Sequence, residues 1–193
     1  PTKAKAKALA EADGLPVFAF DKEDGTSKRS FVVATWSELL AHALKLTRRR
    51  FGFFYEMIPE SSPKRLYFDI ECSGAGCASH ADHADHAEAA LNAVVTAVCA
   101  AVRSTASSLG VDAGEVLVLD GSRPSKCSCH IVFPDLVLVD GDSVRAFVGA
   151  VCASLDPEAR AWVDEGVYDR DRQLRIVGSS KRKLARAERV PLR

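Results

Sequence analysis

The stretch that most constrains how this chain can fold is RLYFDIEC, residues 65–72, where a run suited to a buried strand carries two acids. Its aromatic and branched residues favour a strand. Successive side chains of a strand alternate between its two faces, so Asp69 and Glu71 share one face. Two adjacent carboxylates repel each other, and a hard divalent cation relieves that repulsion. The stretch therefore predicts either a metal site or a solvent-facing strand whose acids pair with Lys or Arg.

The charges of the chain are segregated although its formal net charge is zero. Residues 170–193 carry nine Lys and Arg against two acids, and residues 45–65 carry six against two. Such segregation indicates either a phosphate-binding face next to an acidic metal site or a set of solvated faces with a frayed basic tail. With 193 residues, 47% of them hydrophobic, the chain can form one good-sized domain or two small lobes.

Neither a membrane anchor nor a disulfide framework is expected from the sequence. No apolar run approaches the ~20 residues of a membrane span, and no signal peptide is recognisable. The six cysteines, at positions 72, 77, 99, 127, 129 and 152, form no CxxC pair. We interpret them as reduced structural thiols of an intracellular protein.

The predicted elements alternate irregularly between strands and helices, which favours an α+β fold. A hairpin is followed by a helix that Thr35 caps, with Glu38 at its third position. After the strand with the paired acids, a long helix ends at Gly110. Two or three strands, another helix and a last strand complete the order. The expected ranges are 17–20, 31–33, 36–46, 65–72, 80–109, 115–119, 127–133, 136–140, 143–155 and 173–177.

Two further stretches carry groups that suit phosphate or metal. In SKCSCHIVF, residues 125–133, Lys126, Ser128 and His130 share a strand face and form a candidate cradle for phosphate oxygens. The alternative is a strand end with a satisfied histidine. In VDEGVYDRDRQLRIVGSSK, residues 163–181, Asp164 offers a third carboxylate. Positive charge for a polyphosphate comes there from Arg172, Arg175 and Lys181.

Together the three stretches resemble the archaeo-eukaryotic primase superfamily, most closely its eukaryotic primase-polymerase branch. The motifs of that family, in chain order, are D-x-E, S-x-H and a hydrophobic residue followed by Asp. Here they read Asp69-Ile70-Glu71, Ser128-Cys129-His130 and Val163-Asp164, with 33 residues between His130 and Asp164, fewer than the family carries. The resemblance covers most of residues 15–183.

The resemblance implies an α+β catalytic core of the primase type, with mixed sheets, flanking helices and two small lobes around a central cleft. The core would span residues 15–183, between a basic, Ala-rich segment at 1–14 and a basic tail at 184–193. The zinc-binding C-terminal region of the family has no counterpart in this sequence, so no zinc is expected.

The resemblance also implies which residues act. Two divalent ions, Mg²⁺ or Mn²⁺, would be held by Asp69, Glu71 and Asp164. The incoming triphosphate would be gripped by Lys126, Ser128, His130, Arg175 and Lys181. Arg29, Arg172 and Gln173 are candidates for contacts near the template or nucleotide, and Tyr55 for one near the sugar.

The implied reaction is template-directed nucleotidyl transfer, with template-primer DNA and a dNTP or NTP as substrates. The family also implies a monomer in the nucleus or another DNA-containing compartment, acting in damage tolerance or replication restart. A single-stranded DNA-binding protein would be a partner through regions outside this stretch. A metal-dependent phosphodiesterase or nuclease, and a non-catalytic DNA-binding module of the same fold, remain alternatives.

A group of three histidines, His80, His83 and His86, also suggests a zinc site. Their spacing drifts by about 60° around a helix, which does not direct all three side chains at one ion. We therefore expect an exposed first helical turn there.

Overall fold

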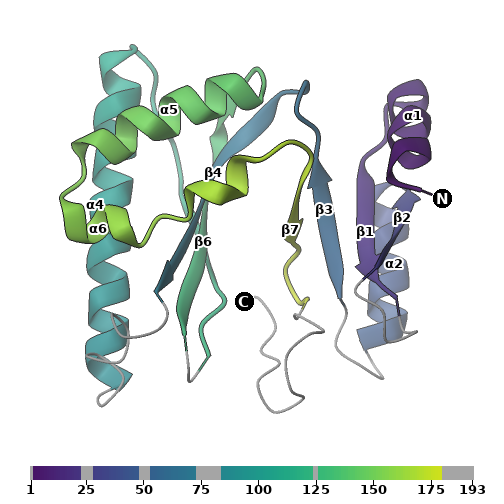
Figure 1. Cartoon of the computed structure of the whole chain (residues 1–193), viewed down its shortest axis with the longest axis horizontal. Coiled ribbons are helices and arrows are strands. Elements are labelled where there is room, and N and C mark those ends of the chain that lie inside the picture. The colour runs from purple at the N-terminus through teal and green to yellow at the C-terminus, as the bar shows by residue number, and fades with distance from the viewer. Residues whose placement is uncertain (1, 23–27, 48–52, 73–83, 124–125, 180–193) are drawn as a thin grey trace. The chain divides into compact units, whose positions relative to one another are not determined.

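The computed structural model describes residues 2–22, 28–47, 53–72, 84–123 and 126–179 (Figure 1). Two antiparallel sheets with flanking helices confirm the predicted α+β class. The sheets have the strand orders β2-β1-β3-β7 and β4-β6-β5. The strands are β1 (Val17–Asp21), β2 (Arg29–Val33), β3 (Phe54–Ile58), β4 (Lys64–Cys72), β5 (Leu117–Asp120), β6 (Cys127–Leu138) and β7 (Arg172–Arg175). The helices are α1 (Lys3–Asp13), α2 (Trp36–Thr47), α4 (Ala84–Ser108), α5 (Gly141–Ser154), α6 (Pro157–Ala161) and the 3₁₀ helix η1 (Glu165–Tyr168).

The chain divides into two compact units. Unit 1 comprises Pro1–Ile58 with Asp171–Arg193, and unit 2 comprises Pro59–Arg170. The chain thus leaves unit 1 after β3 and re-enters it just before β7. Ile58 and Arg172 are paired in the sheet of unit 1, so the points of departure and return are neighbours.

Unit 1 is a four-stranded sheet with a helix on each face. The predicted hairpin is present, with Val17 opposite Val33. On one face, Ala6 of α1 packs with Val17 and Met57. On the other face, Phe18 and Phe54 pack against Leu39 of α2. Strands β1 and β3 therefore bury side chains on both faces, as the alternation of side chains along a strand requires.

Of the two helices of unit 1, the sequence predicts α2 but not α1. The capping box of α2 is confirmed, because Glu38 N donates to Thr35 Oγ1 at 3.2 Å and Thr35 N donates to Glu38 Oε2 at 2.8 Å. No element was assigned to the basic, Ala-rich segment at 1–14, yet α1 occupies it between the N-cap Thr2 and Gly14, whose φ of +65° suits glycine.

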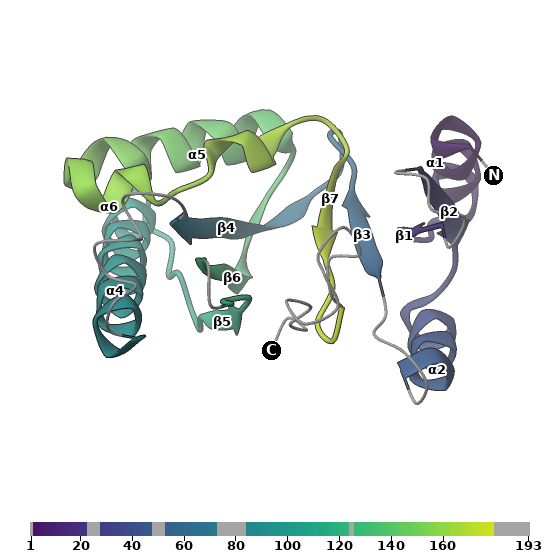
Figure 2. The ribbon, with the colours of Figure 1, turned by 60° about the horizontal axis from the view of Figure 1, so that its bottom comes forward.

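Unit 2 is a three-stranded sheet whose inner face is covered by helices. On this face Leu66, Phe68 and Ile70 of β4 lie opposite Phe133, Ile131 and Cys129 of β6, and all six are almost fully buried. Helices α4 and α5 contact β6 and each other (Figure 2). Helix α4 buries Val94, Val98 and Val102, spaced by four residues, and ends before Gly110 as predicted.

Helix α4 contains a longer apolar stretch than is expected from the sequence. Among the described residues, one helical stretch, Ala87–Ser108 of α4, is long and apolar enough to cross a membrane by length and composition alone. The core helix of a soluble protein passes the same test, so this is weak evidence for a span.

Three details of unit 2 differ from the predicted elements. The two strands expected at 127–133 and 136–140 are one strand, β6, because a register shift between Arg65 and Leu66 absorbs residues 134–136. Strand β5 begins two residues later than expected. The expected ranges include no helix between residues 155 and 173, but Asp156 caps the short helix α6 through a 2.9 Å bond from Ala159 N.

Candidate metal and nucleotide site

The outer face of β4 carries the two acids that the sequence singled out. Asp69 and Glu71 share this face, with side chains 13% and 31% exposed. In the register of β4 with β6, Asp69 lies opposite His130 and Glu71 lies opposite Ser128. Directly opposed residues of an antiparallel pair share a face. The D-x-E and S-x-H motifs therefore face each other on neighbouring strands.

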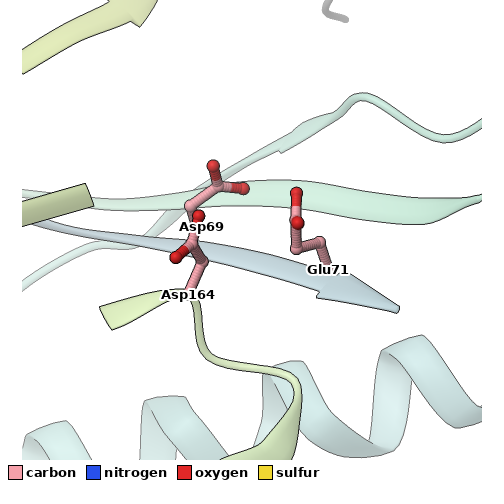
Figure 3. Close-up of side chains that lie close together, drawn as sticks. All are labelled: Asp69, Glu71 and Asp164. Carbon is pink, nitrogen blue, oxygen red and sulfur yellow. The ribbon is translucent and has the colours of Figure 1, made fainter. Parts of the chain in front are cut away.

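The third carboxylate reaches the same place from the other edge of β4. Val163 forms an isolated antiparallel bridge with Ile70. Asp164 N donates to Asp69 O at 2.9 Å, and Glu71 N donates to Trp162 O at 2.8 Å. Carboxylate oxygens of Asp69, Glu71 and Asp164 all lie within 4.8 Å of one another (Figure 3).

Helix η1 fixes the backbone that carries Asp164. Asp164 is its N-cap, and its Oδ1 accepts from Gly166 N at 2.9 Å. Two tyrosines tie η1 to β4: Tyr67 donates its hydroxyl to Val167 O at 3.1 Å, and Tyr168 donates to Tyr67 O at 2.8 Å. Burial raises the pKa of Tyr168 well above its ordinary value, so this hydroxyl stays protonated and remains a donor.

Lys126, just before β6, and polar side chains of β6 complete the group on the outer face. Lys126, only 12% exposed, places Nζ in contact with Glu71 Oε2. His130 Nε2 lies 3.9 Å from Asp69 Oδ1, and Ser128 is 4% exposed. Between these two, Cys129 faces the core, where burial is the main cause that raises its pKa to about 12. The ammonium of Lys126 thus offsets the charge of Glu71, one of the three carboxylates Asp69, Glu71 and Asp164 that form the carboxylate group.

The donor set fits a hard divalent cation. Three carboxylates supply only oxygen ligands, which Mg²⁺, Mn²⁺ and Ca²⁺ prefer, whereas structural zinc sites are built from Cys and His. This is the one group of three or more acidic, His or Cys ligands found within the described residues. His80 and His83 lie outside the described residues, as does the side chain of His86, and the prediction for them stays untested.

A second group of the predicted residues gathers on one face of the sheet of unit 1. Arg29 places its guanidinium 3.7 Å from the centre of the Tyr55 ring. Its NH1 donates to Gln173 Oε1 at 2.7 Å. Arg175 lies directly opposite Tyr55 in the sheet. Four of the residues named for nucleotide or template contacts are thus neighbours.

One member of this second group was not predicted. Asp21 accepts from Arg29 Nε at 3.1 Å and from the hydroxyl of Tyr55 at 3.2 Å. Burial, followed by the charge of Asp21, raises the pKa of Tyr55. Asp21 could have been found from its position at the end of the first hairpin strand, where it lies opposite Arg29.

Arg172 differs from these neighbours in the face of the sheet that it occupies. Arg172 pairs with Ile58, so it projects from the opposite face of the sheet to Gln173. Lys181 lies outside the described residues. The five described cysteines, Cys72, Cys99, Cys127, Cys129 and Cys152, are free thiols.

The fold and the carboxylate group define an α+β protein with a site suited to a divalent cation. The chain is similar to the DNA-directed primase/polymerase protein of Bos taurus, at 29% identity over 134 residues. It is also similar to the Homo sapiens protein of the same name, at 28% identity over 138 residues. These matches cover 68% and 70% of the chain but only 23% of the length of either relative. No family model matches the chain. The predicted resemblance of the chain to primase-polymerases is thus confirmed as sequence similarity.

Proposed function

We propose that this chain carries the catalytic centre of a DNA-directed primase-polymerase that transfers nucleotides to a primer on a DNA template. The observation that carries the proposal is the convergence of three carboxylates from β4 and the Trp162–Asp164 segment, opposite Ser128 and His130 of β6. The similarity to proteins named DNA-directed primase/polymerase supports the same reaction class.

Asp69, Glu71 and Asp164 would hold two divalent ions, Mg²⁺ or Mn²⁺. When bound, such ions supply the charge that activates a primer 3′-hydroxyl and stabilises a leaving pyrophosphate. The carboxylates fix where that charge lies, because β4 and the segment before η1 hold their backbones by paired hydrogen bonds. Lys126, Ser128 and His130 would bind phosphate oxygens beside it, with Lys126 already against Glu71.

The group on unit 1 would contact nucleotide or template DNA. Arg29 and Arg175 offer cationic donors, while Gln173 and the buried ring of Tyr55 orient the guanidinium of Arg29. We further propose that Arg172 and Lys181 add charge for DNA or triphosphate. Damage tolerance or replication restart, in a compartment that contains DNA, is the cellular role that such an activity would serve.

Incubation with a primed DNA template, Mn²⁺ and dNTPs tests the proposal. A primer that lengthens supports nucleotidyl transfer. A primer that shortens indicates a phosphodiesterase or nuclease, and an unchanged primer indicates a DNA-binding module. The variant Asp69→Asn serves as the inactive control, because it removes one of the three carboxylates.

A further inference from the structure

The connection between β5 and β6 brings two basic residues to one face beside the carboxylate group. Arg123 and Lys126 form an antiparallel bridge across this connection, with Arg123 N donating to Lys126 O at 2.9 Å and Lys126 N donating to Arg123 O at 3.0 Å. Residues that exchange both backbone bonds lie directly opposite each other and share a face. Arg123 therefore lies on the face from which Lys126 reaches Glu71.

The charges of these two residues are satisfied unequally. Lys126 is held by Glu71, whereas Arg123 forms no side-chain hydrogen bond or ion pair with any described residue. The Nε of Arg123 is moreover shielded from solvent. Like charges placed directly opposite across two strands destabilise the pair, and a shielded guanidinium nitrogen without an acceptor adds to that cost. An anion bound between the two side chains removes both costs.

Hydrogen bonds hold the backbone before Arg123 and after Lys126, so these two side chains keep their places. Gly121 N donates to Ser128 O at 2.8 Å, and Ser128 N donates to Ser122 Oγ at 3.1 Å. Ser122 N in turn donates to Asp120 Oδ1 at 2.8 Å. The same bonds therefore anchor Arg123 and also Ser128, the serine of the S-x-H motif.

We propose that Arg123 is a further anion-binding residue, which holds the terminal phosphates of the incoming nucleotide together with Lys126. This rests on the proposed function, since it names the polyphosphate as the anion. The planar guanidinium can donate two parallel bonds to phosphate oxygens, whereas Lys126 acts as a point charge that is shared with Glu71. Arg123 thus distinguishes nucleoside triphosphates from monophosphates. Backbone phosphate of DNA has the same chemistry and is the other source that the test must separate.

The test compares Arg123→Gln with Arg103→Gln, which removes an exposed arginine of α4. Calorimetric titrations use dATP, dAMP and inorganic tripolyphosphate in the presence of Ca²⁺. For Arg123→Gln we expect affinity for dATP and tripolyphosphate to fall by roughly 10- to 100-fold, with dAMP unchanged. Arg103→Gln should bind all three as the unaltered chain does, and Arg123→Lys should recover part of the loss. The thermal midpoint of Arg123→Gln without ligand should equal or exceed that of the unaltered chain.

Primed DNA without nucleotide, titrated at two salt concentrations, gives the second arm. Unchanged DNA affinity in Arg123→Gln supports the proposal, and a loss confined to DNA overturns it. Equal dATP affinity in Arg123→Gln and the unaltered chain also overturns the role of Arg123. In that case, primer extension by the unaltered chain would still support the proposed function. If tripolyphosphate binds through Arg123 but no primer is extended, the proposed function fails and this assignment stands. If the unaltered chain binds no polyphosphate, both fail.

Discussion

Three acidic side chains whose oxygens approach within 4.8 Å repel one another whenever no cation lies between them. Lys126 offsets part of this repulsion through Glu71. The three carboxylates therefore destabilise the metal-free chain, and a bound cation relieves this cost. Individual residues of the group can be exchanged without loss of core packing, because all three side chains are only partly buried.

Removal of one carboxylate should separate metal binding from folding. We expect Asp69→Asn or Glu71→Gln to weaken Mn²⁺ binding at least 10-fold and to abolish primer extension, because the charge that holds the ion is reduced. The thermal midpoint in EDTA should stay the same or rise, since a repelling charge is lost. Electron paramagnetic resonance of free Mn²⁺ measures the binding. Glu158→Gln, an exposed acid of α6, is the control. Unaltered Mn²⁺ affinity in a folded Asp69→Asn/Glu71→Gln double variant would exclude the metal site.

The thiol of Cys129 should make stability depend on alkaline pH. Burial raises its pKa from the ordinary value near 9 to about 12. The folded chain then keeps a proton that the unfolded chain releases, so stability is full below about pH 9 and falls as the pH rises toward 12. In Cys129→Ala the urea midpoint should be lower at pH 7, and its further decline between pH 9 and 11 should be smaller. An equally steep decline in both chains would assign the effect to other groups.

At the scale of elements, the 3₁₀ helix η1 connects the core to the carboxylate group. It bears Asp164 at its start and is tied to β4 by the hydroxyls of Tyr67 and Tyr168. Because these bonds are buried, the position of Asp164 depends on side chains that touch no substrate.

Tyr168→Phe should therefore affect both stability and metal binding. The change leaves the buried carbonyl of Tyr67 without its donor, which costs about 1–3 kcal/mol of unfolding free energy. A looser η1 should also weaken Mn²⁺ binding severalfold. Chemical denaturation and Mn²⁺ titration measure the two effects. Ser154→Ala, which removes a helix hydroxyl bonded to Val151 O, should lower neither by a comparable amount. Full Mn²⁺ affinity in Tyr168→Phe would show that η1 does not position Asp164.

Local patterns predicted most of these elements, and the exceptions have physical causes. Alternation placed Asp69 with Glu71 and Ser128 with His130, since a strand has a period of two residues. That the two pairs oppose each other depends on the register of β4 with β6, which no local pattern encodes. The sequence pattern does not reveal helix α1 because all its apolar positions except Leu9 are alanines, which give little contrast, and tertiary packing of Ala6 stabilises it.

The site residues show the same limit. The ion pair of Lys126 with Glu71 and the contact of Asp21 with Arg29 each follow from strand pairing and could not be read from either partner alone. A strand is expected to end at residue 133, yet the carbonyl of Pro134 accepts from Arg65 Nε at 3.1 Å and the strand continues through the bulge. Long-range pairing, and not propensity, decided these cases.

At the scale of the whole molecule, unit 2 is an uninterrupted segment of the chain inserted between two parts of unit 1. It has its own sheet and buried core, and it holds all three carboxylates together with Lys126, Ser128 and His130. Unit 1, by contrast, needs two separate segments to complete its sheet.

Unit 2 should consequently fold and bind metal alone. We expect a fragment of residues 59–170 to unfold cooperatively and to bind Mn²⁺ within about threefold of the whole chain, because each ligand is internal to it. Its affinity for dATP should be lower, since Arg29 and Arg175 are missing. Circular dichroism and Mn²⁺ titration measure the first two properties. The matched comparison is a fragment of unit 1 alone, in which a short glycine linker from Ile58 to Asp171 replaces residues 59–170. An unfolded 59–170 fragment would contradict the independence of unit 2.

The opposed motifs of β4 and β6 also govern which changes of length the chain can accept over evolutionary time. One residue gained or lost inside Leu66–Cys72 or Cys127–Phe133 would turn one pair of polar side chains into the core and bring hydrophobic ones out. The connection between α4 and β5, residues 109–116, belongs to neither strand, and the register of β4 with β6 does not depend on the length of this stretch. Descendants of such a chain are free to lengthen or shorten that stretch, and the spacing between the first two motifs is therefore a poor guide to kinship, while the spacing within each motif is a strict one.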